Sequence, residues 1–500
     1  MLAHNAIYFQ VYGIFSLKRH KICARKFNFL GAANLSNDLQ STSDTENSLD
    51  LRSAFDLIKD LLPPKQIAAY SLRLSPATVY STLTTLMILT MQRLGGGKTL
   101  QSIVREVVCH HSYLFQDNKR IREGTLSTNP SGFSKARGRL SVELTESFCD
   151  TIAKGIIERG TPSFQDRQIY VIDGTTIALS PTSELTKVYP PVTNQFGKTV
   201  WPIMLVTVAH ELYSGAALRP EFGAKNGEDN TSEAEQIETL AKRINRGAIL
   251  LADAGYGIFR VVYRCKRDAG QDVVARLTNA RFKAMKRQAK LIGDEDGISH
   301  YELDWQPTVK DRKNNPELPQ DANIFVQIYS YQRSDGEILN VVSTMRLEPK
   351  KAIELYGLRY TSVEHDIRDL KTTMNLERMT AESDAMVRKE ILCSMVAYNL
   401  IIQFRRQAAK IAKLPPRRIS FTRCYDTVTM YLLNFGSHPL EKWLARYEQA
   451  LALASKDILP IRPGRSFPRK AHPKRPKSTN EQRYKKPKTS TDITTKPPDG

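Results

Sequence analysis

Cysteine is scarce in this sequence, and its few copies are scattered. The 500 residues include six cysteines, with no C-x-x-C pair and no Cys/His grouping at zinc-finger spacing. This excludes a disulfide-stapled scaffold and a structural zinc site, so we expect reduced core thiols. The nine histidines show no H-x-H or H-E-x-x-H spacing either, and none is assigned a role.

Long hydrophobic runs are also missing. No stretch reaches about eighteen consecutive apolar residues, the length that a membrane-spanning helix needs, and the longest candidate, 81–91, is threonine-rich with helical spacing. The apolar segment AIYFQVYGIF near the N-terminus is short, and its basic residues follow it, the reverse of a secretory signal. We expect a cytoplasmic protein without a membrane span, and a loosely ordered extension over residues 1–50.

Acidic residues are outnumbered by basic ones. The chain has 52 Asp and Glu against 73 Lys and Arg, a formal net charge of +21. Such an excess favours a polyanionic partner, with nucleic acid first, over the alternative of a merely solvated surface. A chain of this length can also bury an active site.

Residues 51–160 are rich in apolar residues at three-to-four spacing, which predicts a helical N-terminal domain that binds DNA. Three basic residues lie near its end, Lys135, Arg137 and Arg139. They either contact phosphates or form a solvated helix face, and the sequence favours neither interpretation. Glycines 95–97 resemble a phosphate-binding loop, but Gln92 stands where its first glycine belongs and no buried strand precedes it. Nucleotide binding is therefore excluded.

From residue 165 the hydrophobic period changes to that of strands, and after a β-meander the strands alternate with helices up to residue 412. This predicts an α/β catalytic domain with a mixed sheet. A charged, β-rich stretch at about 278–349 is interpreted as an insertion into it. Two helices, at about 362–376 and 383–412, are expected to close the domain, and a helical segment over 413–460 to follow.

The last forty residues, 461–500, form a basic tail that is expected to be disordered. Its first part, IRPGRSFPRKAHPKRPKSTNEQRYKKPK, carries eleven Lys and Arg against one Glu and is rich in proline. Phe467 and Tyr484 lie among these charges. We favour a DNA-binding arm over a solubilising tail.

Three acidic residues are candidates for a catalytic site. Asp173 is followed by Gly174 at the expected end of one buried strand, and Asp253 follows a second strand of the same sheet. A lone Asp-Gly would more often be a turn that satisfies local amides. Glu364 lies on the closing helix and shares a face with Arg368 and Lys371.

Three carboxylates that converge at a sheet edge would repel one another unless cations neutralise them. Oxygen ligands suit Mg²⁺ or Mn²⁺, and two such ions about 3.5 to 4 Å apart can activate a nucleophile and stabilise the leaving oxygen of a phosphodiester. The sequence therefore predicts a two-metal site that could both hydrolyse and rejoin DNA strands.

Longer blocks around these acids resemble one family. DGTTIALSPTSELTKVYPPVTNQFGKTVWP and AILLADAGYGIF are similar to the first-Asp and second-Asp blocks of DDE transposases of the insertion-sequence-four family. YGLRYTSVEHDIRDLKTTM resembles the Y-R-E-K signature of that family, through Tyr356, Arg359, Glu364 and Lys371. With SGFSKARGRLS and RPGRSFPRKAHPKRPK, the resemblance covers roughly residues 55–477.

The resemblance implies an RNase H-like core with a β-rich insertion, and a bacterial, nucleoid-associated transposase that cleaves and joins DNA at terminal inverted repeats. Asp173, Asp253 and Glu364 would hold the metal ions, while Tyr356, Arg359, Arg368 and Lys371 would contact DNA. Double-stranded DNA and a second copy of the chain, as a homodimer, are the implied partners. A nuclease without strand transfer and a domesticated, non-catalytic DNA-binding protein are the alternatives.

One spacing departs from the family pattern, and two of the candidate residues have an alternative interpretation. The family places three residues between the Arg and the Glu of its signature, whereas four separate Arg359 from Glu364 here, so either the backbone bulges or the helix starts after Arg359. Glu364 could also be the third residue of a capping box that starts at Thr361. Trp305 could stack on a flipped base, but a core position is the favoured interpretation.

Overall fold

The computed structural model describes residues 51–460 apart from positions 74, 76, 116–118, 161–163, 195–196, 334–335 and 378. Within this range the side chains of 194, 197–198, 360–365 and 367 are not described. The expectations for residues 1–50 and for the tail 461–500 lie outside the described residues. The described residues up to Ile458 belong to one compact unit, which contains all the helices and strands given below.

Five strands form the centre of the fold. The strands β2 (Ile169–Ala178), β4 (Gly197–Glu211) and β5 (Glu221–Ala224) make an antiparallel meander, while β6 (Ile249–Ala252) and β7 (Asp272–Arg276) run parallel to β2. Their order in the sheet is β5-β4-β2-β6-β7, and β4 is the one of these five strands that runs antiparallel to the others. This is the strand arrangement of an RNase H-like core, so the expected fold class is confirmed.

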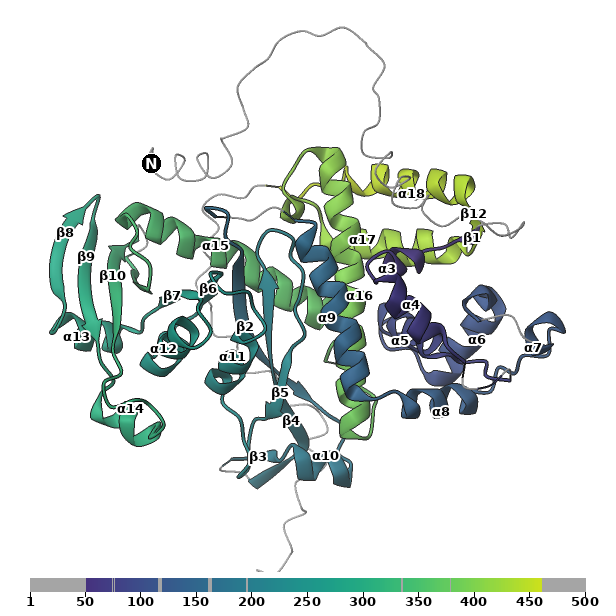
Figure 1. The fold of residues 1–500 in the computed structure, drawn as a ribbon, viewed down its shortest axis with the longest axis horizontal. Coiled ribbons are helices and arrows are strands. Elements are labelled where there is room, and N and C mark those ends of the chain that lie inside the picture. Colours follow the sequence, from purple (N-terminus) through teal and green to yellow (C-terminus); the bar gives the residue numbers. More distant parts are fainter. Residues whose placement is uncertain are drawn as a thin grey trace, which may run out of the picture. The chain divides into compact units, whose positions relative to one another are not determined.

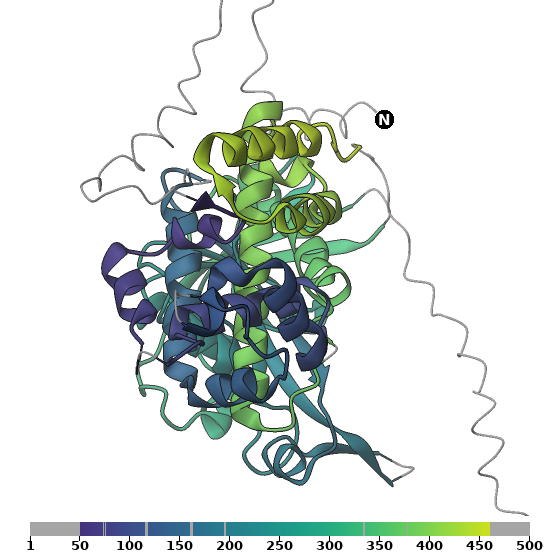
Figure 2. The ribbon, with the colours of Figure 1, turned by 90° about the vertical axis from the view of Figure 1, so that its right-hand side faces the viewer.

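The residues between β7 and the next long helix extend the same sheet. The strands β8 (Lys290–Glu295), β9 (Ile298–Trp305), β10 (Ile324–Gln332) and β11 (Ile338–Ser343) form an antiparallel series, and β11 pairs with β7. With β3 (Pro191–Asn194), which pairs with β4, the sheet holds ten strands in the described residues. Figure 2 shows the β3–β4 hairpin projecting at the lower right.

Alternating side chains of the strands face two different layers of helices. On one face, α11 (Glu233–Ala241) and α12 (Phe259–Arg267) pack against even-numbered residues of β2 and β6. On the other face, α15 (Pro349–Arg368) covers Ile169, Val171, Ile249 and Leu251. The central strands are therefore buried on both faces, which explains their continuous apolar sequences.

The longest described helix, α16 (Asp384–Ala412), packs against both the N-terminal helices and the core, as Figure 1 shows. One continuous hydrophobic cluster joins them. Serine caps such as Ser81 and Ser141 start two of the N-terminal helices. These helices are α3 (Asp56–Lys59), α4 (Pro64–Ser71), α5 (Thr82–Leu94), α6 (Leu100–His110), α7 (Lys119–Arg122), α8 (Ser131–Arg139) and α9 (Val142–Glu158).

The remaining elements are short or C-terminal. The strand β1 (Leu51–Arg52) pairs with β12 (His438–Pro439), which joins the start of the described chain to the segment directly before α18. None of the helices in the described ranges has the length and apolar character that a bilayer crossing requires. The other helices are α10 (Ser183–Val188), α13 (Asn279–Lys286), α14 (Val309–Asn314), α17 (Phe421–Asp426), the π-helical η5 (Thr427–Leu432) and α18 (Leu440–Ala454).

Two local expectations from the sequence are wrong. The closing helix does not begin at residue 362, because α15 begins at Pro349 and runs through Arg368 into a π-helical segment, η3 (Asp369–Thr373). Thr361 is thus in mid-helix and cannot start a capping box. Asp173 also does not end its strand, because β4 keeps pairing with β2 as far as Ala178.

Candidate active site

Asp173 and Asp253 lie at corresponding positions of neighbouring parallel strands. The last paired residues of the β2–β6 ladder are Val171 and Leu251, and each aspartate follows two positions later. Because side chains alternate along a strand, both aspartates belong to the face that α15 covers. The sheet therefore brings two carboxylates, 80 residues apart in the sequence, to one site.

Each of these carboxylates accepts a hydrogen bond from a backbone amide close to it in the sequence. Oδ1 of Asp173 accepts a hydrogen bond from the Gly174 amide at 3.0 Å, and Oδ1 of Asp253 accepts one from the Gly255 amide at 2.8 Å. Burial raises the pKa of Asp173, the charge of Arg359 opposes that rise, and the charge of Asp253 adds to it. A cation bound between the two carboxylates would relieve both their repulsion and the cost of burial.

Arg359 extends from α15 toward this pair of aspartates. Its Nη2 lies 4.0 Å from Oδ2 of Asp253, and its side chain is only 14% exposed. Its Nε has no hydrogen-bond partner among the side chains that the structure describes. A mostly buried guanidinium with a spare donor at this place suits an anionic oxygen, such as one on a phosphodiester.

Glu364 belongs to the backbone of α15, but its side chain lies outside the described residues. A regular α-helix places positions 359 and 364 about 140° apart around its axis. The π-helical irregularity of this region, η3, begins at Asp369, after both positions. The structure thus brings Arg359 to the aspartates and leaves the third acid as a prediction.

The other residues of the signature are spread over α15 and η3. Tyr356 is fully buried in the core between α15 and the sheet, which gives it a packing role in place of the DNA contact that the resemblance implies. Arg368 is exposed, and Lys371 lies 3.3 Å from Glu377 as an ion pair. Arg368 and Lys371 can therefore reach a ligand at the surface, whereas Tyr356 cannot.

Trp305, at the end of β9, is 7% exposed and packs edge-on against Phe259 of α12, with ring centroids 5.5 Å apart. This is the core position that the sequence favours over base stacking. Of the three basic residues near the end of the N-terminal helices, Lys135 and Arg139 are exposed. Arg137 pairs with the buried Glu390 at 3.6 Å, so it has a structural role.

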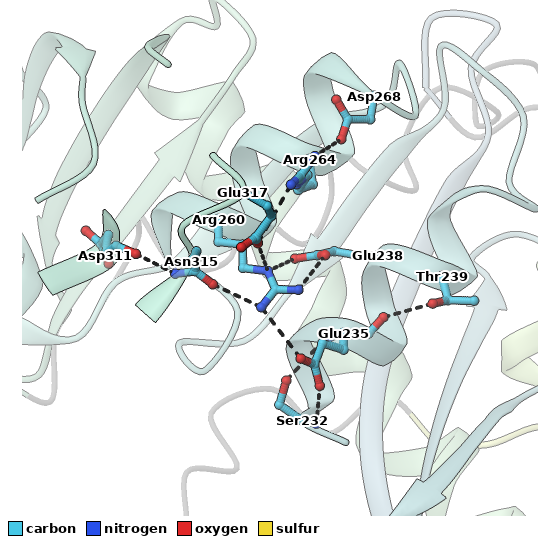
Figure 3. Close-up of polar contacts among 10 residues, drawn as sticks. All are labelled: Ser232, Glu235, Glu238, Thr239, Arg260, Arg264, Asp268, Asp311, Asn315 and Glu317. Atoms are coloured by element: carbon cyan, nitrogen blue, oxygen red, sulfur yellow. Dashed lines mark hydrogen bonds and ion pairs between the residues drawn. The ribbon is translucent and has the colours of Figure 1, made fainter. Parts of the chain in front are cut away.

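The insertion is fastened to the core close to the site. Arg260 of α12 bonds to Glu238 of α11 and to Asn315, which follows α14, and lies near Glu317 (Figure 3). Nη1 of Arg281, on α13, donates to the carbonyl of Ala254, directly after Asp253, at 3.0 Å. No sequence pattern indicates these contacts, because each joins residues more than 20 positions apart.

A cationic segment begins at this attachment. No acidic residue lies between Asp272 and Asp294, while α13 and the start of β8 expose four basic side chains. These four are Lys283, Lys286, Arg287 and Lys290. They form the basic segment of the insertion, and its first turn is tied by Arg281 to the loop that carries Asp253.

Sequence reasoning also missed Glu233 and Tyr256. Glu233 is the first residue of α11, and its Oε2 accepts a hydrogen bond from Tyr256 Oη at 2.9 Å. A Cβ added to Gly174 would lie 2.9 Å from Glu233 Cδ and 3.0 Å from Tyr256 Oη. The glycine after Asp173 is therefore needed for this close approach; the Asp-Gly pair was the only sequence signal.

The donor set fits a hard divalent cation. Asp173 and Asp253 offer oxygen only, and each keeps its Oδ2 clear of the backbone amide that binds its Oδ1. Within the described ranges, no three Asp, Glu, His or Cys side chains are grouped closely enough to hold a metal ion. The two aspartates supply part of a metal site, and the expected third ligand is the side chain at position 364.

Comparison with known families agrees with this geometry. Residues 164–400 match the family model described as the transposase DDE domain, a range that holds Asp173, Asp253 and all of α15. The members of this family are catalytic phosphoryl-transfer enzymes. A comparison with curated proteins found no match.

Among solved structures, this chain is similar to a piggyBac transposase in a synaptic complex with hairpin DNA. The two sequences are 10% identical, and the match covers 83% of this chain and 86% of that chain, with a TM-score of 0.41.

Proposed function

We propose that this chain, which carries a transposase DDE domain over residues 164–400, is a DNA transposase of the insertion-sequence-four type. It would bind the terminal inverted repeats of its own element, cleave the strands there and join them to target DNA. The observation that carries the proposal is the placement of Asp173 and Asp253 in register on one sheet face, with Arg359 beside them.

Asp173, Asp253 and Glu364 are proposed to hold two Mg²⁺ or Mn²⁺ ions. When bound, such ions neutralise charge on the phosphodiester and lower the pKa of the attacking hydroxyl or water. A backbone amide holds one oxygen of each aspartate, which leaves the other oxygen directed to bind a metal ion. Arg359 would donate to a non-bridging phosphate oxygen and so hold the scissile group in line.

Several exposed cations can carry the DNA backbone to this site. The basic segment of the insertion, Lys283 to Lys290, starts beside the Asp253 loop. Arg368 ends α15, the helix that carries Arg359, and Lys371 follows it in η3. Contacts of this kind bind phosphates without reading sequence. Because two element ends must be joined, we propose that a homodimer acts on double-stranded DNA.

A nuclease that cuts without strand transfer has the same acid cluster, so only the joined product separates it from a transposase. A catalytically silent DNA-binding protein would have no need for two carboxylates held in register. An assay that follows both nicking and joining of an element-end duplex therefore distinguishes all three functions.

The test uses the full chain, a duplex bearing the inverted repeat that flanks its gene, and Mg²⁺ or Mn²⁺. Asp173→Asn and Asp253→Asn should each lose cleavage by orders of magnitude and keep DNA affinity, because few phosphate contacts involve these carboxylates. Asp304→Asn, at an exposed position of β9, is the matched control. Wild-type nicking by either site variant would overturn the assignment.

A further inference from the structure

Backbone pairing sets only part of the distance between the two catalytic aspartates. The β2–β6 ladder stops at Val171 and Leu251, two residues before them, and the β6–β7 ladder stops at Ala252. Asp173 stays in place through the continued pairing of β2 with β4. The segment that begins with Asp253 is no longer paired with either neighbouring strand, so contacts outside the ladders help to fix it relative to Asp173.

A hydrogen bond on the opposite face of the sheet connects the segment after Asp253 with the part of β2 that holds Asp173. Tyr256, three residues after Asp253 and 2% exposed, donates its hydroxyl to Glu233 at the start of α11. Both side chains lie against Gly174, whose missing Cβ leaves the room that they occupy. The pair therefore contacts the backbone directly after Asp173, and its Tyr256 belongs to the segment that follows Asp253.

The position of this pair excludes a direct role in chemistry. Gly174 alternates with Asp173 along β2, so Glu233 and Tyr256 lie on the face of the sheet away from α15 and from the paired carboxylates. Lys225 lies 3.9 Å from Glu233 as a weak counterion. A buried hydroxyl that bonds to a carboxylate is costly to leave unpaired, so the contact resists displacement of the loop.

We propose that Glu233 and Tyr256 are positioning residues that fix the separation of Asp173 and Asp253 for the divalent cations. This inference rests on the proposed function, because it presumes that the two aspartates bind metal. Metal ligands must be held within a few tenths of an ångström, and loss of groups that orient them typically lowers metal affinity by about 10- to 100-fold. Glu233 and Tyr256 act here through the backbone of both ligands.

The experiment measures Mn²⁺ binding to the full-length protein without DNA, from the loss of the electron paramagnetic resonance signal of free Mn²⁺. Tyr256→Phe and Glu233→Ala should weaken binding about tenfold, while Glu233→Gln, which keeps an oxygen acceptor for the tyrosine, should stay near wild type. Tyr263→Phe, which removes another tyrosine hydroxyl on α12, is the control. In nicking assays, excess Mn²⁺ should restore the rate of Tyr256→Phe.

The outcomes separate this inference from the proposed function. Unchanged Mn²⁺ affinity in Tyr256→Phe and Glu233→Ala, with a lower unfolding midpoint, would show a purely structural contact and overturn the inference while nicking by the wild type stands. Wild-type protein that binds Mn²⁺ with the expected ranking of variants but never cuts DNA would overturn the function and leave the inference. Wild-type protein that binds no Mn²⁺ would overturn both.

Discussion

Arg417 donates two hydrogen bonds to the Asp366 carboxylate, from Nη1 to Oδ1 at 2.7 Å and from Nη2 to Oδ2 at 2.9 Å. Asp366 is 1% exposed on α15, and Arg417 lies in the segment that follows α16. Burial alone would raise the pKa of Asp366, but the charge and hydrogen bonds of Arg417 outweigh it and the pKa is lowered. The pair fixes the rotation of α15, and with it the direction of Arg359.

Asp366→Asn should destabilise the protein by about 3 to 5 kcal/mol, because it leaves a buried guanidinium without its counterion. The effect should appear in stability, because Asp366 pairs with Arg417 and does not face the two aspartates of the candidate site. Asp369→Asn is the matched control, since burial raises the pKa of Asp369 to about 6 and its charge is already disfavoured. Equal urea midpoints for the two variants would refute the distinction.

Glu364→Gln should fold, bind DNA and fail to cut, because the amide keeps the shape of the side chain but loses its affinity for metal. Cleavage in Mg²⁺ and the unfolding midpoint are to be measured on the same preparation. Glu354→Gln, on an earlier turn of α15, controls for loss of an acid on this helix. Full activity of Glu364→Gln would show that the third ligand lies elsewhere.

Replacing Lys283, Lys286, Arg287 and Lys290 together by Gln should weaken binding to all DNA sequences alike. Each lost phosphate contact lowers the slope of log affinity against log salt by about 0.9, so four contacts would lower it by about 3 to 4. The control replaces four exposed lysines of other elements, Lys154, Lys242, Lys442 and Lys456. Equal slopes for both sets would make the basic segment a solvated surface.

Because His210 is buried, we expect the protein to lose stability in mild acid. Burial lowers the pKa of His210 from 6.5 to about 4, with the charges of Asp366 and Arg417 acting in opposite directions. Between these two pH values the unfolded chain binds a proton that the folded chain does not. Stability therefore falls as the pH drops from 6.5 to 4, by at most about 3 kcal/mol.

His210→Phe should reduce this fall in stability between pH 6.5 and pH 4. The phenyl ring should keep the edge-on packing against Tyr398, whose ring centroid lies 5.7 Å from that of His210. Asp369 contributes with the opposite sign in the same range, since its raised pKa favours the folded state as the pH falls toward 4. That contribution is common to both proteins and cancels in their difference. Urea unfolding at pH 7 and at pH 4.5 is the measurement, and parallel losses in both proteins would contradict the prediction.

Much of the fold could be predicted because its strands are buried on both faces and leave continuous apolar runs such as Ile249–Ala252. The limits of elements were harder to predict. Pairing with β4 carries β2 past Asp173, and tertiary packing starts α15 thirteen residues before the expected position 362. In both places long-range contacts outweighed the local signals.

The candidate site shows the same division. Asp173 and Asp253 were found because a carboxylate that follows a buried apolar run stands out in the sequence. Glu233 and Tyr256 were not, since their contact joins the start of one helix to a loop 23 residues later, across a glycine in a third segment. Tyr356 matched a signature but is fully buried, and a motif cannot tell packing from contact with a ligand.

The pairing of β11 with β7 also bears on how the sheet avoids adding a strand from another molecule. Without the insertion, β7 would be the last strand of the core, and its unpaired amides and carbonyls would invite a strand from another molecule. The insertion moves that exposed margin to β8, where Leu291 and Ile292 are flanked by Lys290 on one side and Asp294 and Glu295 on the other. Charged neighbours of this kind oppose strand addition, so the insertion shields the catalytic sheet from aggregation.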